Sequence, residues 1–143
     1  MRLIGFDFDK ISVEKLSEIK DFKDLKINTN INVAEIESFE SDMLKLKEDL
    51  LKVKFSYKIN YNPDFAVMEL AGNVILAMDN KMSKNVLKEW KDKKINSDFQ
   101  IPLFNIILRK SNIKALQLEE EMNLPLHLSL PFLKKENKQV ENK

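Results

Sequence analysis

The strict alternation between residues 51 and 61 constrains this chain more than any other feature. Apolar or aromatic residues occupy every second position, namely Leu51, Val53, Phe55, Tyr57, Ile59 and Tyr61. The positions between them are polar, and three of them are lysines. A period of two indicates a β-strand with one buried face. A slip of one residue would bury those lysines, so the register of this strand is firmly specified.

A hairpin is expected to follow. Asn62, Pro63 and Asp64 form a turn signal. Residues 65–76 then return as a second strand, whose inward side chains are Ala66, Met68, Leu70, Val74 and Leu76. Two strands joined by three turn residues indicate an antiparallel pair.

The N-terminal part predicts two further strands. Residues 3–8 form a short alternating stretch, and in residues 27–33 β-branched side chains alternate with three asparagines. Between them, Ser12 is expected to cap a short helix that extends to Lys20. Residues 39–50 fit either a helix or an irregular connection.

After Asp79 the pattern changes to a helical period. Ser83 is expected to cap a helix that carries Trp90, and Asp98 to cap the next helix, with Pro102 tolerated in its first turn. A polar run at 109–112 interrupts the apolar stripe, so residues 98–122 form one long helix or two stacked ones. Two prolines favour an extended segment over residues 124–133.

Strands that precede helices in this order predict an α+β fold, with a four-stranded antiparallel sheet and C-terminal helices packed on one face. The alternating βαβ units of a parallel nucleotide-binding sheet are missing from the pattern. Residues 1–133 are expected to form a single domain, and residues 134–143 a charged, disordered tail.

Composition narrows the function. The chain has no cysteine, which excludes disulfides and thiolate metal sites. Its net charge is +1 and it has only two arginines, Arg2 and Arg109, which argues against a nucleic-acid partner. No apolar run approaches the length of a membrane helix, and the N-terminus does not read as a signal peptide. We therefore expect a cytoplasmic protein without a cofactor or a bound metal.

Asp7 and Asp9 are the main catalytic candidates. Asp7-Phe8-Asp9 after an apolar stretch is similar to the first motif of the haloacid-dehalogenase-like phosphatases, which implies a magnesium site with a nucleophilic and an acid/base carboxylate. However, Ile11 stands where that motif has Thr or Val, and Asp79 is a lone candidate for the downstream acidic pair. Carboxylates at i and i+2 of a strand more simply form a solvated face, so the sequence favours a protein that is not an enzyme.

His127 is the only histidine, and with no cysteine it cannot build an ordinary zinc site. A surface or packing role is therefore favoured over catalysis. The run from Glu119 to Glu121 near a helix end is expected to be a solvated face, or one that meets basic groups of a partner.

The pattern over residues 27–133 resembles the SecB protein-export chaperone family. Three features support this resemblance: the strand at 27–33, the hairpin at 51–76 and the segment at 101–133. The last of these, IPLFNIILRKSNIKALQLEEEMNLPLHLSLPFL, looks like a long helix followed by an extended segment that contains prolines. The resemblance implies a four-stranded antiparallel sheet followed by a long helix. It also implies a domain that binds unfolded or precursor polypeptides as a homo-oligomer, either a dimer or a tetramer. The acidic surface by which that family docks the export motor is not evident at a net charge of +1.

We expect an aromatic groove to receive the polypeptide, because a sheet edge and alternate pockets accept many sequences. The residues expected to line it are Tyr57, Tyr61, Phe65, Trp90 and Phe104. Trp90 has a second interpretation, as a core anchor between its own helix and the sheet. The alternative function is a non-enzymatic adaptor that binds one specific folded partner.

Overall fold

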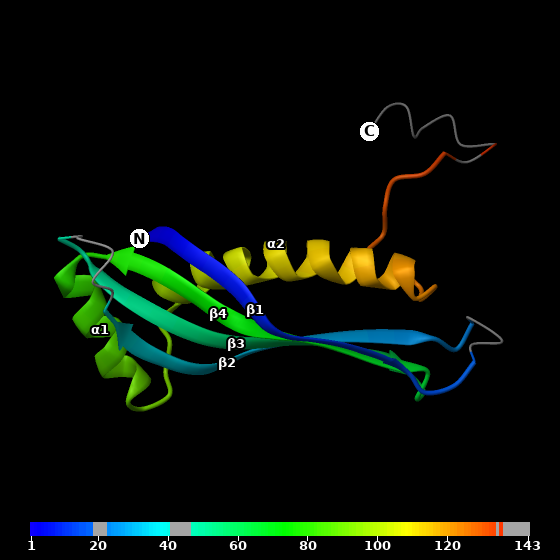
Figure 1. Ribbon diagram of the computed structural model, residues 1–143, viewed down its shortest axis with the longest axis horizontal. Helices are drawn as coiled ribbons and strands as arrows, with labels where there is room; N and C mark the ends of the chain where they lie inside the picture. The colour runs from blue at the N-terminus through cyan, green and yellow to red at the C-terminus, as the bar shows by residue number, and fades with distance from the viewer. Residues whose placement is uncertain (19–22, 41–46, 134, 136–143) are drawn as a thin grey trace.

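The computed structural model describes residues 1–18, 23–40, 47–133 and 135 (Figure 1). Four strands are followed by two helices: β1 (Arg2–Lys15), β2 (Lys26–Phe39), β3 (Asp49–Asn62), β4 (Ala66–Met78), α1 (Asn80–Trp90) and α2 (Ser97–Glu121). The strands form one antiparallel sheet in the order β1-β4-β3-β2. Helix α2 lies along one face of this sheet, and α1 lies at one end (Figure 1). The predicted α+β class is therefore confirmed.

The central strands follow the alternation in the sequence. The odd-numbered residues of β3 from Leu51 to Tyr61 are buried, and the five predicted inward residues of β4 are buried with them. The three β3 lysines point to the opposite face, since each pairs in register with residues of that face of β4. The strand register predicted from the sequence is correct.

The first strand is longer than the sequence pattern suggests. Residues 12–15, expected to start a helix, belong to β1, where Val13 pairs with Met68 and Lys15 with Ala66. The expected helix is wrong here because the ladder to β4 satisfies this backbone and outweighs the local capping signal of Ser12. Residues 19–22 lie outside the described part of the chain.

The strand predicted at 27–33 is also longer, since β2 extends to Phe39 with a register shift between Val33 and Glu35. Of the ambiguous stretch 39–50, Phe39 ends β2, and Asp49 begins β3. Residues 41–46 lie outside the described residues.

Both helices begin earlier than expected. Asp79 caps α1, and its side chain accepts a hydrogen bond from the Met82 N–H at 2.8 Å. Asn96 caps α2 in the same way, since its side chain accepts a hydrogen bond from the Phe99 N–H. The expected caps are therefore wrong: Ser83 is buried within α1, and Asp98 lies in the first turn of α2. A carboxylate or amide that directly precedes the first turn satisfies the free N–H groups there.

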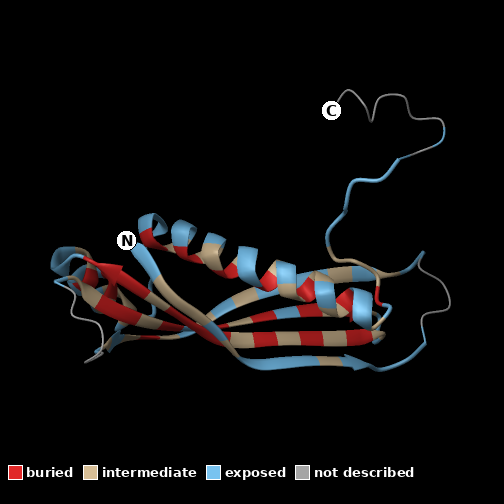
Figure 2. Cartoon of the chain, turned by 45° about the horizontal axis from the view of Figure 1, so that its top comes forward, coloured by how far each residue is buried: buried red, intermediate tan, exposed pale blue. Residues whose placement is uncertain are grey.

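Helix α2 is a single helix of 25 residues. Its buried side chains recur at every fourth position: Phe99, Leu103, Ile107, Ser111, Ala115 and Glu119. A row of this spacing is inclined to the helix axis, so the helix can follow a twisted sheet along its whole length. Figure 2 shows this row as buried patches on the sheet side, with the outer side exposed.

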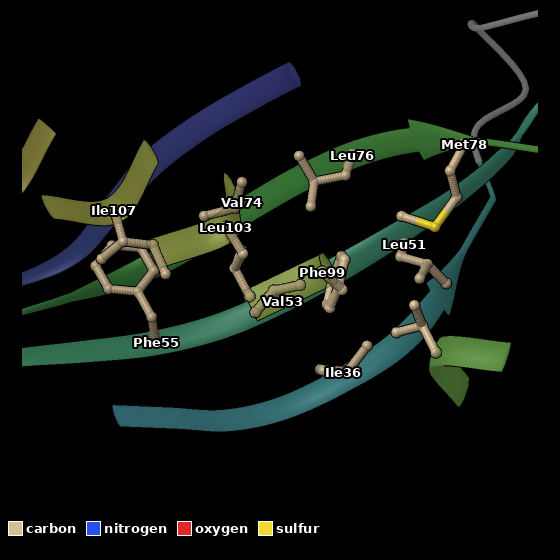
Figure 3. Close-up of a cluster of buried hydrophobic side chains, with 11 residues drawn as sticks. Ile36, Leu51, Val53, Phe55, Val74, Leu76, Met78, Phe99, Leu103 and Ile107 are labelled. Atoms are coloured by element: carbon tan, nitrogen blue, oxygen red, sulfur yellow. The ribbon is translucent and has the colours of Figure 1, made fainter. Parts of the chain in front are cut away.

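The core divides into two clusters along α2. The first is apolar and gathers Phe99, Leu103 and Ile107 with residues of β3 and β4 (Figure 3). The second contains Tyr57, Tyr61 and Ala115, together with Leu124 from beyond the helix.

Gly72 lies in β4 opposite Phe8 of β1, and the β1 backbone comes close to it there. A Cβ atom at this position would be 2.0 Å from the carbonyl oxygen of Asp7. Phe8 of β1 and Phe55 of β3 pair with Gly72 from its two sides, and the centroids of their rings lie 6.2 Å apart. Glycine is needed here for the close approach of two backbones rather than for a special backbone angle.

Residues 124–133 contain no helix or strand. Leu124 and the His127 side chain are buried, whereas residues 128–133 are exposed and lead away from the body of the molecule beyond α2 (Figure 1). Of the expected tail at 134–143, residue 134 and residues 136–143 lie outside the described part. In the described residues, neither helix has the length and apolar character needed to span a membrane.

Candidate functional site

A cavity of about 500 Å³ opens beside β2, at the end of the molecule that carries α1. It lies within the size range of protein ligand sites, roughly 300–1,000 Å³. Its wall combines one sheet edge with the connection between the helices and the start of α2. The lining residues are Ile31, Asn32, Val33, Ala34, Trp90, Lys93, Ile95, Gln100 and Phe104. We refer to this cavity as the β2 groove.

The contribution of β2 to this groove is continuous along the chain. Four consecutive residues, 31–34, line it, so the strand presents its backbone edge as well as one face. Within the described residues, β2 is an edge strand that pairs with β3 alone. An unpaired strand edge can receive another extended chain. The bulge between Val33 and Glu35 interrupts this edge at one end of the groove.

Trp90 and Phe104 form the aromatic part of the groove. Both are partly buried and pack against the apolar core cluster, so their rings are supported from behind. The Lys93 ammonium lies 4.5 Å from the centroid of the Trp90 ring, within the range of a cation–π contact. Trp90 thus packs on the core with one side and lines the β2 groove with another.

Tyr57 and Tyr61 lie elsewhere. They are 3% and 0% exposed, beneath the C-terminal half of α2, and neither lines the β2 groove. Phe65 is partly buried and packs against the same second cluster, after the β3–β4 turn. Of the five expected residues, the structure therefore brings only Trp90 and Phe104 together in this groove, and adds Ile31 and Val33.

The two tyrosines belong to a buried polar network. The Tyr57 hydroxyl donates to Asn112 Oδ1 at 2.7 Å, and the Tyr61 hydroxyl donates to the Glu119 carboxylate. Burial, together with the hydrogen bond to Glu119, raises the pKa of Tyr61. Burial also raises the pKa of Tyr57.

Glu119 contradicts the expected solvated face. It is fully buried, whereas its neighbours Glu120 and Glu121 are exposed as expected. The spacing of four that starts at Phe99 carries Glu119 into the interface with the sheet. This spacing was the signal in the sequence that could have placed it there.

His127 completes the network from the C-terminal segment. Its ring Nδ1 lies 2.8 Å from Glu119 Oε1, its Nε2 lies 2.8 Å from Asn112 Oδ1, and its backbone N–H donates to Glu119 Oε2 at 3.1 Å. The side chains of His127 and Glu119 are both fully enclosed. A substrate has no access to these groups, so the favoured packing role of His127 agrees with its position.

Asp7 and Asp9 are exposed on β1. Asp9 accepts a hydrogen bond from Asn73 Nδ2 at 2.7 Å, and β1 pairs antiparallel with β4. The phosphatase resemblance implies a parallel sheet, so the arrangement differs from it. In the described residues, no group of three or more potential ligands could hold a metal ion.

The architecture is an α+β fold, in which a four-stranded antiparallel sheet is followed along the chain by two helices that pack against it. The structure is similar to the SecB-like chaperone Rv1957 of Mycobacterium tuberculosis, solved in complex with a ChAD peptide from the Rv1956 HigA1 antitoxin. The TM-score is 0.50 at 12% sequence identity, over 94% of this chain and 91% of the other. This likeness shows a SecB-like fold. No protein-family model matches the chain, and neither does any curated protein.

Proposed function

We propose that this protein binds extended, apolar polypeptide segments in the β2 groove, as a chaperone-type domain. The observation that supports this most strongly is the combination of an unpaired strand edge with two partly buried aromatic rings, Trp90 and Phe104. Backbone pairing along a sheet edge accepts many sequences, and pockets beside it select the side chains.

The fold likeness supports the same proposal. The neighbour with this fold was solved with a bound peptide. Here, the apolar lining from Ile31, Val33 and Ile95 and the aromatic rings would receive large apolar side chains of a client. Lys93 lies at the same site and would interact with carboxylates that flank them.

The proposal can be tested by fluorescence, because Trp90 is the only tryptophan. Unfolded, tryptophan-free client peptides should shift its emission and saturate the signal. Phe104→Ala should weaken this binding by about tenfold or more, as expected for an aromatic hot spot.

The matched control is Phe65→Ala. Phe65 is also a partly buried phenylalanine, but it belongs to the second core cluster. The groove assignment fails if both variants lose affinity equally or if neither does. A response to one protein alone, with none to several unrelated unfolded chains, would instead support the alternative of a dedicated adaptor.

We also propose that the chain assembles into at least a dimer. Both β1 and β2 are edge strands of 14 residues, and each can pair with another chain. Light scattering at high micromolar concentration should give at least twice the mass of one chain. A monomer under these conditions would contradict the proposal.

A hydrolytic role for Asp7 is not proposed. Magnesium-dependent cleavage of a generic phosphate ester should be undetectable, and Asp7→Asn should change nothing. Cleavage that this substitution abolishes would reverse the conclusion.

A further inference from the structure

The C-terminal segment at residues 128–133 exposes a concentration of large apolar side chains. Among the described residues, ten large hydrophobic side chains are exposed, and four of them lie within this short segment. Leu128, Leu130 and Leu133 are 42%, 51% and 84% exposed. A contiguous exposed apolar surface of this kind marks an interaction site. The segment therefore has the character of a ligand for another apolar surface.

The segment also has the form of an extended strand. Its apolar side chains alternate with Ser129 and Pro131, since they stand at Leu128, Leu130 and Phe132. In an extended chain, alternate residues share a side-chain direction and also the side to which their backbone N–H and C=O groups point. If the leucine positions pair with a sheet edge, the missing N–H of Pro131 falls on the other side. The proline is thus compatible with pairing along one side of the segment.

The β2 groove has the features that such a segment needs. Its wall combines the edge of β2 at residues 31–34 with apolar and aromatic side chains. The charges beyond the two regions are complementary as well. The exposed Lys135 follows the segment, and Glu35 and Glu37 follow the groove along β2. A parallel alignment of the segment with β2 would bring this lysine toward these carboxylates.

Residues 128–133 of the same chain cannot fill this groove. His127 holds the start of the segment at Asn112 and Glu119, through contacts of 2.8 Å. At about 1.5 Å per helical residue, these two positions lie roughly 12 and 22 Å along α2 from Phe104, which lines the groove. Six extended residues span at most about 20 Å. Most of the segment would be needed to reach the groove, whereas the segment of a second copy is not restrained in this way.

We propose that residues 128–133 of one copy dock in the β2 groove of a second copy and compete there with clients. The inference rests on the proposed function of the groove and adds a regulation of that site. The docked leucines occupy the apolar pockets, and the backbone of the segment extends the second sheet past β2. A client must displace the segment, so its docking lowers the apparent affinity for clients, and more strongly at higher protein concentration.

Disulfide trapping tests the docking between copies, because the chain has no cysteine. Ser129→Cys and Asn32→Cys are introduced into separate chains, at exposed positions of the segment and of the groove. When these chains are mixed under mild oxidation, the mixed disulfide-linked pair should exceed the share expected for random pairing. The matched control uses Ser12→Cys, an exposed position of β1, in place of Asn32→Cys, and should give no excess. Equal yields with the two partners would overturn the proposal.

Competition is tested with Leu130→Gln in the full chain. Titrations with unfolded peptide, followed by Trp90 fluorescence at high micromolar protein concentration, should give an apparent affinity about threefold higher or more, because the groove is then free. Ile113→Gln is the matched control, since Ile113 on α2 is 53% exposed and Leu130 is 51% exposed, and it should leave the affinity unchanged. Dilution of the unmodified protein should raise its affinity in the same direction. An affinity that neither Leu130→Gln nor dilution changes would overturn the proposal.

The docking of the segment and the binding of clients can fail separately. Client binding that Phe104→Ala weakens, without an excess of the mixed disulfide, would support the proposed function and overturn the docking of the segment. An excess of the mixed disulfide that Phe104→Ala abolishes, with no binding of unrelated unfolded peptides, would support the docking. It would then assign the groove to copies of this chain and contradict the proposed function.

Discussion

The two halves of α2 pack on the same sheet by different chemistry. The N-terminal half buries Phe99, Leu103 and Ile107 in an apolar cluster, beside which the β2 groove opens. The C-terminal half continues the same row with Ser111, Ala115 and Glu119 above two tyrosines. Apolar packing depends on shape and area, whereas the polar half depends on each donor meeting its acceptor. The first half can leave an open groove, while the second must stay closed.

The largest effect is expected at the apolar half. Phe99→Ala should lower the free energy of unfolding by about 3–5 kcal/mol, because Phe99 is fully buried and its removal leaves a cavity. Urea denaturation measures this change. Ile101→Ala, on the exposed side of the same helix, should stay within about 0.5 kcal/mol of the unmodified protein. Equal costs at the two positions would contradict the described face of α2.

A single hydroxyl should matter at the polar half. Tyr61→Phe should cost about 1.5–3 kcal/mol, since its hydroxyl donates to a buried carboxylate. Tyr57→Phe should cost less, about 0.5–1.5 kcal/mol, because its acceptor is the neutral amide of Asn112. The same denaturation experiment ranks the two variants. If Tyr57→Phe costs more stability than Tyr61→Phe, the charged acceptor of this network is not the Glu119 carboxylate.

Trp90 should have a smaller effect on stability than on binding. Because it is only partly buried, Trp90→Ala should cost roughly 1–2 kcal/mol, below the value for full burial of a large side chain. Peptide affinity, measured by calorimetry on the same variant, should fall by about tenfold or more. Destabilisation as large as that of Phe99→Ala, with unchanged affinity, would assign Trp90 to the core alone.

Alkaline pH should affect the polar half through its phenols. Burial raises the pKa of Tyr57 and Tyr61 in the folded protein, whereas tyrosines of the unfolded chain ionise near pH 10. Their stabilising effect is complete below about pH 10, and it is lost as pH rises above that value, by at most about 1.4 kcal/mol per pH unit for each group. Denaturation at increasing pH should show this loss, with a shallower slope in Tyr61→Phe. If stability falls with pH at the same slope in both proteins, Tyr61 does not contribute to the loss of stability at alkaline pH.

The sequence predicts this sheet better than it predicts the site. Alternation defines which side chains of β3 and β4 share a face, because a slip would bury lysines. It cannot tell whether that face is open or covered, and for this reason Tyr57 and Tyr61 were expected in a groove although α2 lies over them. Ser12 provides a local capping signal, but the pairing of residues 12–15 with β4 outweighs it, so the helix that the sequence predicts there does not form.

The groove itself was only half predictable. Trp90 and Phe104 stand out as large aromatics, but Ile31 and Val33 join them only because β2 is an edge strand, which depends on the strand order. His127 shows the same limit, since its partners Asn112 and Glu119 come from another element. The spacing of four along α2 was nevertheless visible in the sequence, and it would have placed Glu119 correctly.

The close approach of β1 at Gly72 also has a consequence for evolution, because it constrains one of the two glycines of this chain and leaves the other free to vary. Any side chain at position 72 would overlap the Asp7 carbonyl, so substitutions there should be rejected whatever their polarity. At Gly5, the nearest atom to an added Cβ is Ile75 Cγ1 at 3.7 Å, an ordinary contact. Homologues with this fold should therefore keep glycine at position 72 and readily replace Gly5 with alanine.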